Sequence, residues 1–194
     1  MAKSGEVLEN PTTGQRIIFR RTSGETAGEL LEVESIYTGP SPSRPPTHYH
    51  PAQEEIFRVL AGELHVVING RQRVLKKGET LVIVEGARHQ MWAEEAGVRA
   101  NWQTRPALKS EAFFETMFGL AAQGKTNEKG APNLLQAAVI ARAYSDEFRL
   151  ARPPWPVQRL LFALLAPVGR LLGYQADRPG YLSSGAPSGS TRLA

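Results

Sequence analysis

HYHPAQEEIFRVLAG, residues 48–62, places two histidines and a carboxylate at short spacing ahead of an apolar run. Side chains two apart on a strand point to the same face, so His48 and His50 project together. Glu55 opens the next extended run, and His89 follows in a later strand after a Gly-containing turn. Neutral imidazoles with one carboxylate suit Fe, Mn, Ni, Cu or Zn. The pattern therefore predicts one divalent transition metal, held by these four residues.

The composition narrows the chemistry further. The chain has 194 residues, no cysteine and four histidines. The missing cysteines exclude a disulfide framework, a thiolate zinc site, an iron–sulfur cluster and a cysteine nucleophile. Any transition metal must therefore be bound by histidines and carboxylates. The length suits one domain with an extension.

The net charge of +4 lies in the second half of the chain. Residues 1–105 carry 13 basic and 13 acidic residues, whereas residues 106–194 carry 10 and 6. The basic residues of the second half are spread singly, which is typical of solvated helix faces and not of a nucleic-acid interface. We therefore expect no nucleic-acid partner.

The apolar stretches predict neither secretion nor a membrane span. Residues 1–10 have no apolar core of a signal peptide. The most apolar stretch, residues 160–168, is far shorter than the roughly 20 residues that a spanning helix needs. The expected location is the cytoplasm.

Residues 16–104 carry the pattern of many short strands. Residues 31–37 alternate with a period of two, and Asn69-Gly70 is a strong two-residue hairpin signal because both positions need positive φ. Close spacing of such strands predicts a sandwich or barrel. The expected strands are 16–21, 31–37, 47–50, 54–61, 63–68, 72–75, 80–84, 88–93 and 98–104.

The rest of the chain has helical periodicity. Apolar residues recur at helical spacing over 111–122, 133–150 and 156–173. The third of these segments is apolar almost all round, with only a narrow polar stripe. That pattern favours burial over contact with a membrane surface, so we do not expect a membrane partner.

One segment of the helical half satisfies a nucleotide-binding pattern. GLAAQGKT, residues 119–126, matches GxxxxGK[ST]. A P-loop must join a buried strand to a helix, but the preceding residues are predicted as helix. We therefore interpret the segment as the end of a helix.

Residues 48–62 and 78–93 resemble the two sequence motifs of the cupin superfamily. The first motif, G(X)5HXH(X)3–4E(X)6G, is matched from His48 through Glu55 to Gly62, although its leading glycine is displaced. The second, G(X)5PXG(X)2H(X)3N, is matched by Gly78, Gly86 and His89. Val84 and Ala93 replace the proline and asparagine of the second motif. Neither position is a metal ligand.

The resemblance covers about residues 15–105 and implies a mainly β fold, a double-stranded β-helix or jelly-roll barrel with one metal inside. An α-helical C-terminal extension of about three helices follows. We expect residues 1–106 to form the barrel with its N-terminal strands. Residues 107–182 would pack on the barrel or at an interface, and residues 183–194 would form a disordered tail.

Two further residues compete for ligand roles. The family's spacing allows either Glu54 or Glu55, and we favour Glu55 because six residues separate it from Gly62. His65, the fourth histidine, lies between apolar strand residues and is not expected to bind the metal.

Strand alternation from the ligands indicates a largely apolar pocket, suited to a small organic molecule. Phe57 shares a face with Glu55, and Met91 shares one with His89. Trp102 and Tyr37 are further candidates. No side chain outside the metal ligands stands out as a general acid or base, so the catalytic residues stay unknown.

The resemblance leaves several functions open. The first is a metal-dependent enzyme, most often in this superfamily a dioxygenase acting on a small organic compound. The alternatives are a non-catalytic ligand-binding or sensor protein, an isomerase or lyase, and a membrane-associated or scaffolding protein with a vestigial site. Cupins are commonly dimers, so a homodimer is also an expectation.

Overall fold

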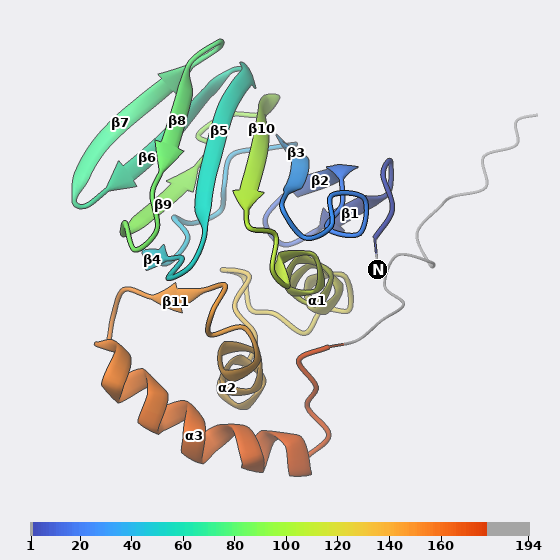
Figure 1. Ribbon diagram of the computed structural model, residues 1–194, viewed down its shortest axis with the longest axis vertical. Coiled ribbons are helices and arrows are strands. Elements are labelled where there is room, and N and C mark those ends of the chain that lie inside the picture. Colours follow the sequence, from blue (N-terminus) through green and yellow to red (C-terminus); the bar gives the residue numbers. More distant parts are fainter. Residues whose placement is uncertain (1, 178–194) are drawn as a thin grey trace, which may run out of the picture.

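The computed structural model describes residues 2–177 as two antiparallel sheets with helices at one end of them (Figure 1). The six-stranded sheet runs in the order β1 (Val7–Asn10), β2 (Gln15–Arg21), β3 (Leu31–Tyr37), β10 (Val98–Arg105), β5 (Glu54–Ala61), β8 (Thr80–Ile83). The five-stranded sheet runs in the order β11 (Arg149–Leu150), β4 (His48–Tyr49), β9 (His89–Trp92), β6 (Glu63–Ile68), β7 (Arg71–Lys76).

The inner faces of the two sheets share one apolar core. Phe57 and Ala100 from one sheet, and Leu64, Val66 and Leu75 from the other, are buried in it. Burial of alternate residues on facing sheets is the main stabilising force of such a sandwich. The structure is therefore a jelly-roll barrel, and the predicted fold class is confirmed.

Local sequence explains the tight turns of the barrel. Asn69 and Gly70 have φ values of 48° and 83° and join β6 to β7, with Ile68 paired to Arg71. Positive φ at both positions is what a two-residue hairpin of this type requires. The predicted hairpin is confirmed.

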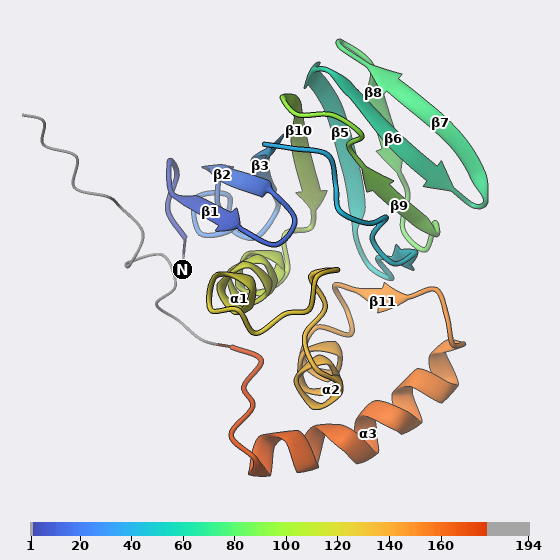
Figure 2. The same ribbon diagram turned by 180° about the vertical axis from the view of Figure 1, so that it is seen from behind.

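A second apolar core joins the N-terminal strands to helix α1 (Ser110–Ala122). Ile17 and Phe19 of β2 are fully buried, and Phe114 and Phe118 of α1 pack against them. Helix α1 therefore covers the end of the sheet where β1 and β2 lie (Figure 2). Strand β1 was not expected from the sequence. The segment 119–122 lies in α1, as expected of a helix end and not of a P-loop.

The helix predicted over residues 133–150 is too long. Helix α2 (Leu134–Ala143) ends before this segment does, and β11 follows as a short strand antiparallel to β4. The amide of Ala151 also donates to the carbonyl of Thr47 at 2.8 Å. Pairing with the exposed edge of the barrel satisfies backbone groups of both segments, and this tertiary contact overrides the helical periodicity.

Helix α3 (Trp155–Leu171) lies outermost, with α2 between it and the sheets (Figures 1 and 2). A narrow stripe of α3 residues faces α2. Gly169 lies on this stripe, where an added Cβ would meet the Val139 side chain of α2 at 2.8 Å. The chain itself covers little of this apolar helix: Leu160 and Leu164 are each 65% exposed and Leu171 is 88% exposed. Its burial at an interface stays a prediction. One stripe is all that a single neighbouring helix can cover. Among the described residues, none of the helices has the length and apolar character to cross a membrane. The predicted tail, residues 183–194, lies outside the described residues.

Candidate metal centre

The three predicted histidine ligands converge inside the barrel. His48 on β4 pairs with His89 on β9, and their ring centroids are 4.3 Å apart. His50 lies 5.2 Å from each of them. One nitrogen of each ring lies within 4.8 Å of the others, so the three could ligate one ion.

Each imidazole is held by a main-chain carbonyl at its Nδ1 atom. The acceptors are Pro46 for His48 and Ala87 for His89, both at 3.0 Å. His50 bonds in the same way to Glu147. A carbonyl oxygen can only accept, so Nδ1 carries the proton and each neutral ring keeps its lone pair on Nε2. Bonding of the second ring nitrogen is how proteins orient histidines that bind a metal.

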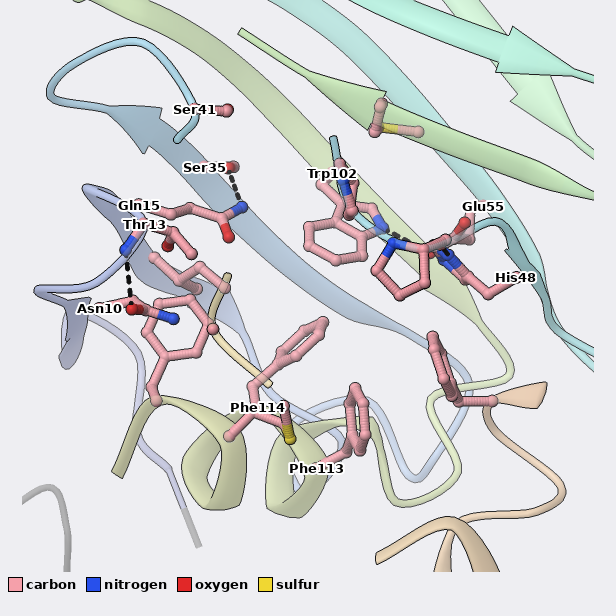
Figure 3. Close-up of a pocket in the computed structure, with 18 of the residues that line it drawn as sticks. Asn10, Thr13, Gln15, Ser35, Ser41, His48, Glu55, Trp102, Phe113 and Phe114 are labelled. Carbon is pink, nitrogen blue, oxygen red and sulfur yellow. Dashed lines mark hydrogen bonds between the residues drawn. The ribbon is translucent and has the colours of Figure 1, made fainter. Parts of the chain in front are cut away.

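Glu55 reaches two of these imidazoles from β5. Its Oε2 atom lies 3.0 Å from Nε2 of His89 and 3.3 Å from Nε2 of His50. Its Oε1 atom accepts a hydrogen bond from the indole of Trp102 at 2.9 Å. The indole therefore holds one carboxylate oxygen while the other faces the imidazoles of His50 and His89. Trp102, Glu55 and His48 lie together on one side of the pocket (Figure 3).

Burial and mutual charge shift the pKa values at the centre. Burial, with the neighbouring His89 and His50, lowers the pKa of His48 to about 3, so its ring is neutral near pH 7. Burial opposes the charge of Glu55, but His50 and His89 hold its pKa below the usual range. Burial likewise opposes the charge of His50, but the Glu55 carboxylate raises its pKa.

The contacts at the centre fit a bound cation. Nε2 of His50 and Oε2 of Glu55 are both buried without a hydrogen-bond partner among the described residues. Two lone pairs facing each other at this separation repel unless a proton or a metal ion lies between them. Three imidazoles and one carboxylate are also a donor set that suits a divalent transition metal.

The structure separates the competing residues. Glu55 is fully buried at the centre, whereas the neighbouring Glu54 lies on the other side of β5 and is only half-buried. His65 lies away from the group, 3.7 Å from a carboxylate oxygen of Glu94 and stacked on Trp92.

A cavity of about 280 Å³ adjoins the centre, and the four residues predicted for a pocket all line it. Phe57 and Trp102 stack at 5.2 Å between ring centroids. Burial raises the pKa of Tyr37 to about 12, so its phenol stays protonated. The fourth residue, Met91, is half-buried.

Residues far along the chain also form the centre, and the sequence did not indicate them. Phe148 stacks on His48 at 4.7 Å between ring centroids and on Phe113 of α1 at 5.4 Å. The carbonyl of Glu147 orients His50. The segment carried no metal-binding pattern of its own.

Comparison with known proteins agrees with this geometry. A family model described as "Cupin domain" matches residues 38–102. An oxidoreductase of Arthrobotrys oligospora is 32% identical over 186 residues, covering 88% of this chain and 70% of the relative. The chain belongs to the cupins.

Two other proteins are also similar to this cupin. The probable oxidoreductase virH of Hypocrea virens is 31% identical over 153 residues, covering 72% of the cupin and 68% of the relative. The crystal structure of an RmlC-like cupin from Shewanella frigidimarina is 18% identical, with a TM-score of 0.47, covering 57% of this chain and 93% of that one.

Proposed function

We propose that this cupin is a metal-dependent oxidoreductase that acts on a small, largely apolar organic compound. One observation carries the proposal: a buried carboxylate oxygen of Glu55 lies 3.3 Å from Nε2 of His50 and 3.0 Å from Nε2 of His89, an arrangement that a bound metal ion would stabilise. The relatives named as oxidoreductases support the class of reaction.

The donor set suits Fe, Mn, Ni, Zn or Cu. A metal bound by His48, His50, Glu55 and His89 would supply Lewis acidity or redox chemistry beside the cavity. A metal held by these four residues would have room for further ligands, and its redox chemistry would suit a dioxygenase-like reaction of an organic compound with O₂.

The chain's own residues prepare the site. Backbone carbonyls accept from Nδ1 of the imidazoles and leave Nε2 aimed inward, and the Trp102 indole fixes Glu55. Apolar side chains along the cavity exclude water and orient the substrate by shape.

Metal analysis tests the proposal directly. We expect the protein, loaded in turn with Fe(II), Mn(II), Ni(II), Zn(II) and Cu(II), to retain close to one equivalent of at least one metal. His50→Ala and His89→Ala should lose it. The control is His65→Ala, which replaces a histidine of the same barrel outside the centre and should retain the metal. The proposal fails if none of the five metals is retained by the natural protein.

Oxygen uptake separates an enzyme from a binding protein. Metal-loaded protein should consume O₂ when a neutral aromatic substrate is supplied, and His89→Ala should not. Tight binding of such compounds without turnover would instead favour a ligand-binding cupin, for which the apolar cavity is equally suited. Product formation without O₂ uptake would favour an isomerase or lyase.

A further inference from the structure

Helix α3 has an apolar face that the described part of the chain leaves open. Its buried residues, Gln158, Phe162, Ala166 and Gly169, recur every three or four positions and form the stripe toward α2. A second stripe, the α3 face, consists of large apolar residues that are 40–88% exposed: Val157, Leu160, Leu161, Leu164, Val168 and Leu171. A contiguous row of exposed leucines and valines marks a surface that binds a partner.

The α3 face lies on the outside of the molecule. Helix α3 is the outermost element, and α2 lies between it and the sheets, so the stripe remote from α2 points away from the barrel (Figures 1 and 2). A helix of 17 residues is about 25 Å long. An extended surface could therefore contact the whole helix while the barrel stays clear of it.

The charges around α3 are of one sign. Residues 148–176 contain four arginines and no aspartate or glutamate. Arg152, Arg159 and Arg170 are exposed, and none of them forms an ion pair with a residue of the described chain. The fourth, Arg149, pairs with Asp146 at 3.6 Å and stacks over the ring of Trp155 at 3.9 Å.

Two of these arginines border the α3 face along one side. Arg159 and Arg170 are eleven positions apart, about three turns, so they project from the same side of the helix, between the α2 stripe and the open face. The surface therefore combines exposed leucines with positive charge that the described chain does not neutralise. Charge complementarity calls for a partner that is apolar beneath and anionic at its surface.

An anionic membrane has both properties. A helix lying in its surface buries the apolar face at the boundary between headgroups and acyl chains, and its arginines reach the level of the lipid phosphates. The half-buried indole of Trp155, at the start of the helix, also suits the headgroup region. The composition of α3 favoured burial over a membrane surface only if the chain itself buried the helix, and the structure shows that it does not.

A second copy of the chain fits this surface less well. A twofold contact through the α3 face would pair the helix with itself. In an antiparallel pair centred between Leu164 and Leu165, Arg159 of one copy would lie beside Arg170 of the other. Neither helix offers an acidic side chain to compensate, and like charges brought together oppose association.

We propose that the α3 face binds the surface of a membrane that contains anionic phospholipids, with α3 lying in the plane of the interface. The barrel and the candidate metal centre then stay on the water side of α2. Vesicle binding through α3 needs no metal, so it can succeed or fail independently of the proposed function.

Co-sedimentation of the full-length protein with vesicles tests the proposal. One set of vesicles is phosphatidylcholine alone, and the other contains about one third phosphatidylserine. We expect binding to the anionic set, much weaker binding to the neutral set, and release in about 0.5 M KCl because salt screens the attraction. Replacing both Arg159→Gln and Arg170→Gln should weaken binding about 30-fold. Replacing both Leu160→Gln and Leu164→Gln should weaken it at least about tenfold.

Matched variants on the barrel make the result specific to α3. Val82→Gln with Val84→Gln removes two exposed valines at β8, and Arg71→Gln with Arg73→Gln removes two exposed arginines of β7. Both strands lie at the other end of the molecule from α3 (Figure 1), so these variants should bind like the natural protein. Unchanged melting temperatures show that every variant is folded.

A fluorescent label reports which surface enters the lipid. The chain has no cysteine, so one introduced cysteine can carry a polarity-sensitive dye. The dye on Leu171→Cys should shift to the blue when anionic vesicles are added, because the labelled side chain leaves water. The dye on Val82→Cys should not shift.

Four results would overturn the proposal. The first is absence of binding to the anionic vesicles, and the second is binding that neither pair of α3 substitutions weakens. The third is a blue shift at Val82→Cys without one at Leu171→Cys. The fourth is a dimer in sedimentation equilibrium that the two leucine substitutions break, without vesicle binding, which would assign the face to a second copy. If only a chain ending at Asp177 binds vesicles, the following residues occupy the face and the proposal is equally wrong.

Discussion

His50 donates its Nδ1–H to the main-chain carbonyl of Glu147, a residue 97 positions further along the chain. The bond links the first metal-binding motif to the segment between α2 and β11. The C-terminal extension is therefore part of the candidate centre and not an appendage to the barrel.

Phe148 follows Glu147, and its substitution tests how far the centre depends on this segment. Phe148→Ala removes the ring stacked on His48 and Phe113, so the imidazole loses its packing support. We expect metal affinity to fall roughly tenfold, the lower range for residues that support metal ligands. Competition against a chelator measures it. Phe148→Leu should restore part of the affinity, and Leu164→Ala on the exposed face of α3 should change nothing. Equal affinities in all variants would contradict the role of Phe148.

The indole of Trp102 is the hydrogen-bond donor to Glu55. Trp102→Phe keeps an aromatic ring against Phe57 but removes the donor, so Glu55 should lose its fixed orientation. We expect metal affinity to fall about tenfold with little loss of thermal stability. Trp92→Phe is the matched control, since that indole donates to Glu94 outside the centre at 3.1 Å. A Trp102→Phe protein with unchanged metal affinity would show that the bond is dispensable.

The contacts of Glu34 with two arginines should make the stability of the protein depend on pH. Arg99 Nε donates to its carboxylate at 2.7 Å, and Arg20 donates at 2.5 Å. Burial opposes ionisation, but the two guanidinium groups lower the pKa of Glu34 below its ordinary value of 4.5. The stabilisation is therefore complete above pH 4.5 and is lost as the pH falls through the lowered pKa.

Glu34→Gln should accordingly reduce the free energy of unfolding by about 1.5–3 kcal/mol at pH 7, the range for hydrogen bonds to a charged group. The difference from the natural protein should shrink as the pH falls below 4.5. Denaturant titrations at several pH values measure both. Glu9→Gln, which breaks an exposed pair with Arg16, should change stability by less than about 1 kcal/mol. A Glu34→Gln deficit that stays constant down to low pH would refute the assignment.

Gly62, which ends the first motif, is required for two structural reasons. Its φ is +69°, and an added Cβ would lie 2.8 Å from Val98 Cγ2 and 3.1 Å from Val98 Cα. Gly62→Ala should therefore destabilise the barrel by about 1–3 kcal/mol through overpacking, with backbone strain from the positive φ adding to this loss. Gly39→Ala, at a glycine with open space and no positive φ, should stay within about 1 kcal/mol. Thermal unfolding compares the two, and equal melting temperatures would contradict the prediction.

The sequence allowed one centre to be predicted from His48, His50, Glu55 and His89. Strand alternation and turn chemistry are local rules, so they can be applied without the tertiary structure. The same rules predicted β5 and β6 with the bounds that the structure shows. They also indicated Phe57, Met91, Trp102 and Tyr37 as residues of one pocket. The role of Trp102 as a donor to Glu55 could not be read in this way, because it depends on the register of β10 against β5.

The amino-acid sequence by itself predicted a sandwich or barrel of short strands with two histidines on one face, because alternation along a strand decides which side chains point the same way. The resemblance to the cupin motifs added the jelly-roll barrel and the choice of Glu55 as the carboxylate ligand. Only the tertiary structure decided what surrounds these residues. Residues 149–150 join the sheet because an exposed strand edge competes successfully with helical periodicity. Phe148 reaches His48 through a contact between segments that are distant along the chain and carry no shared pattern.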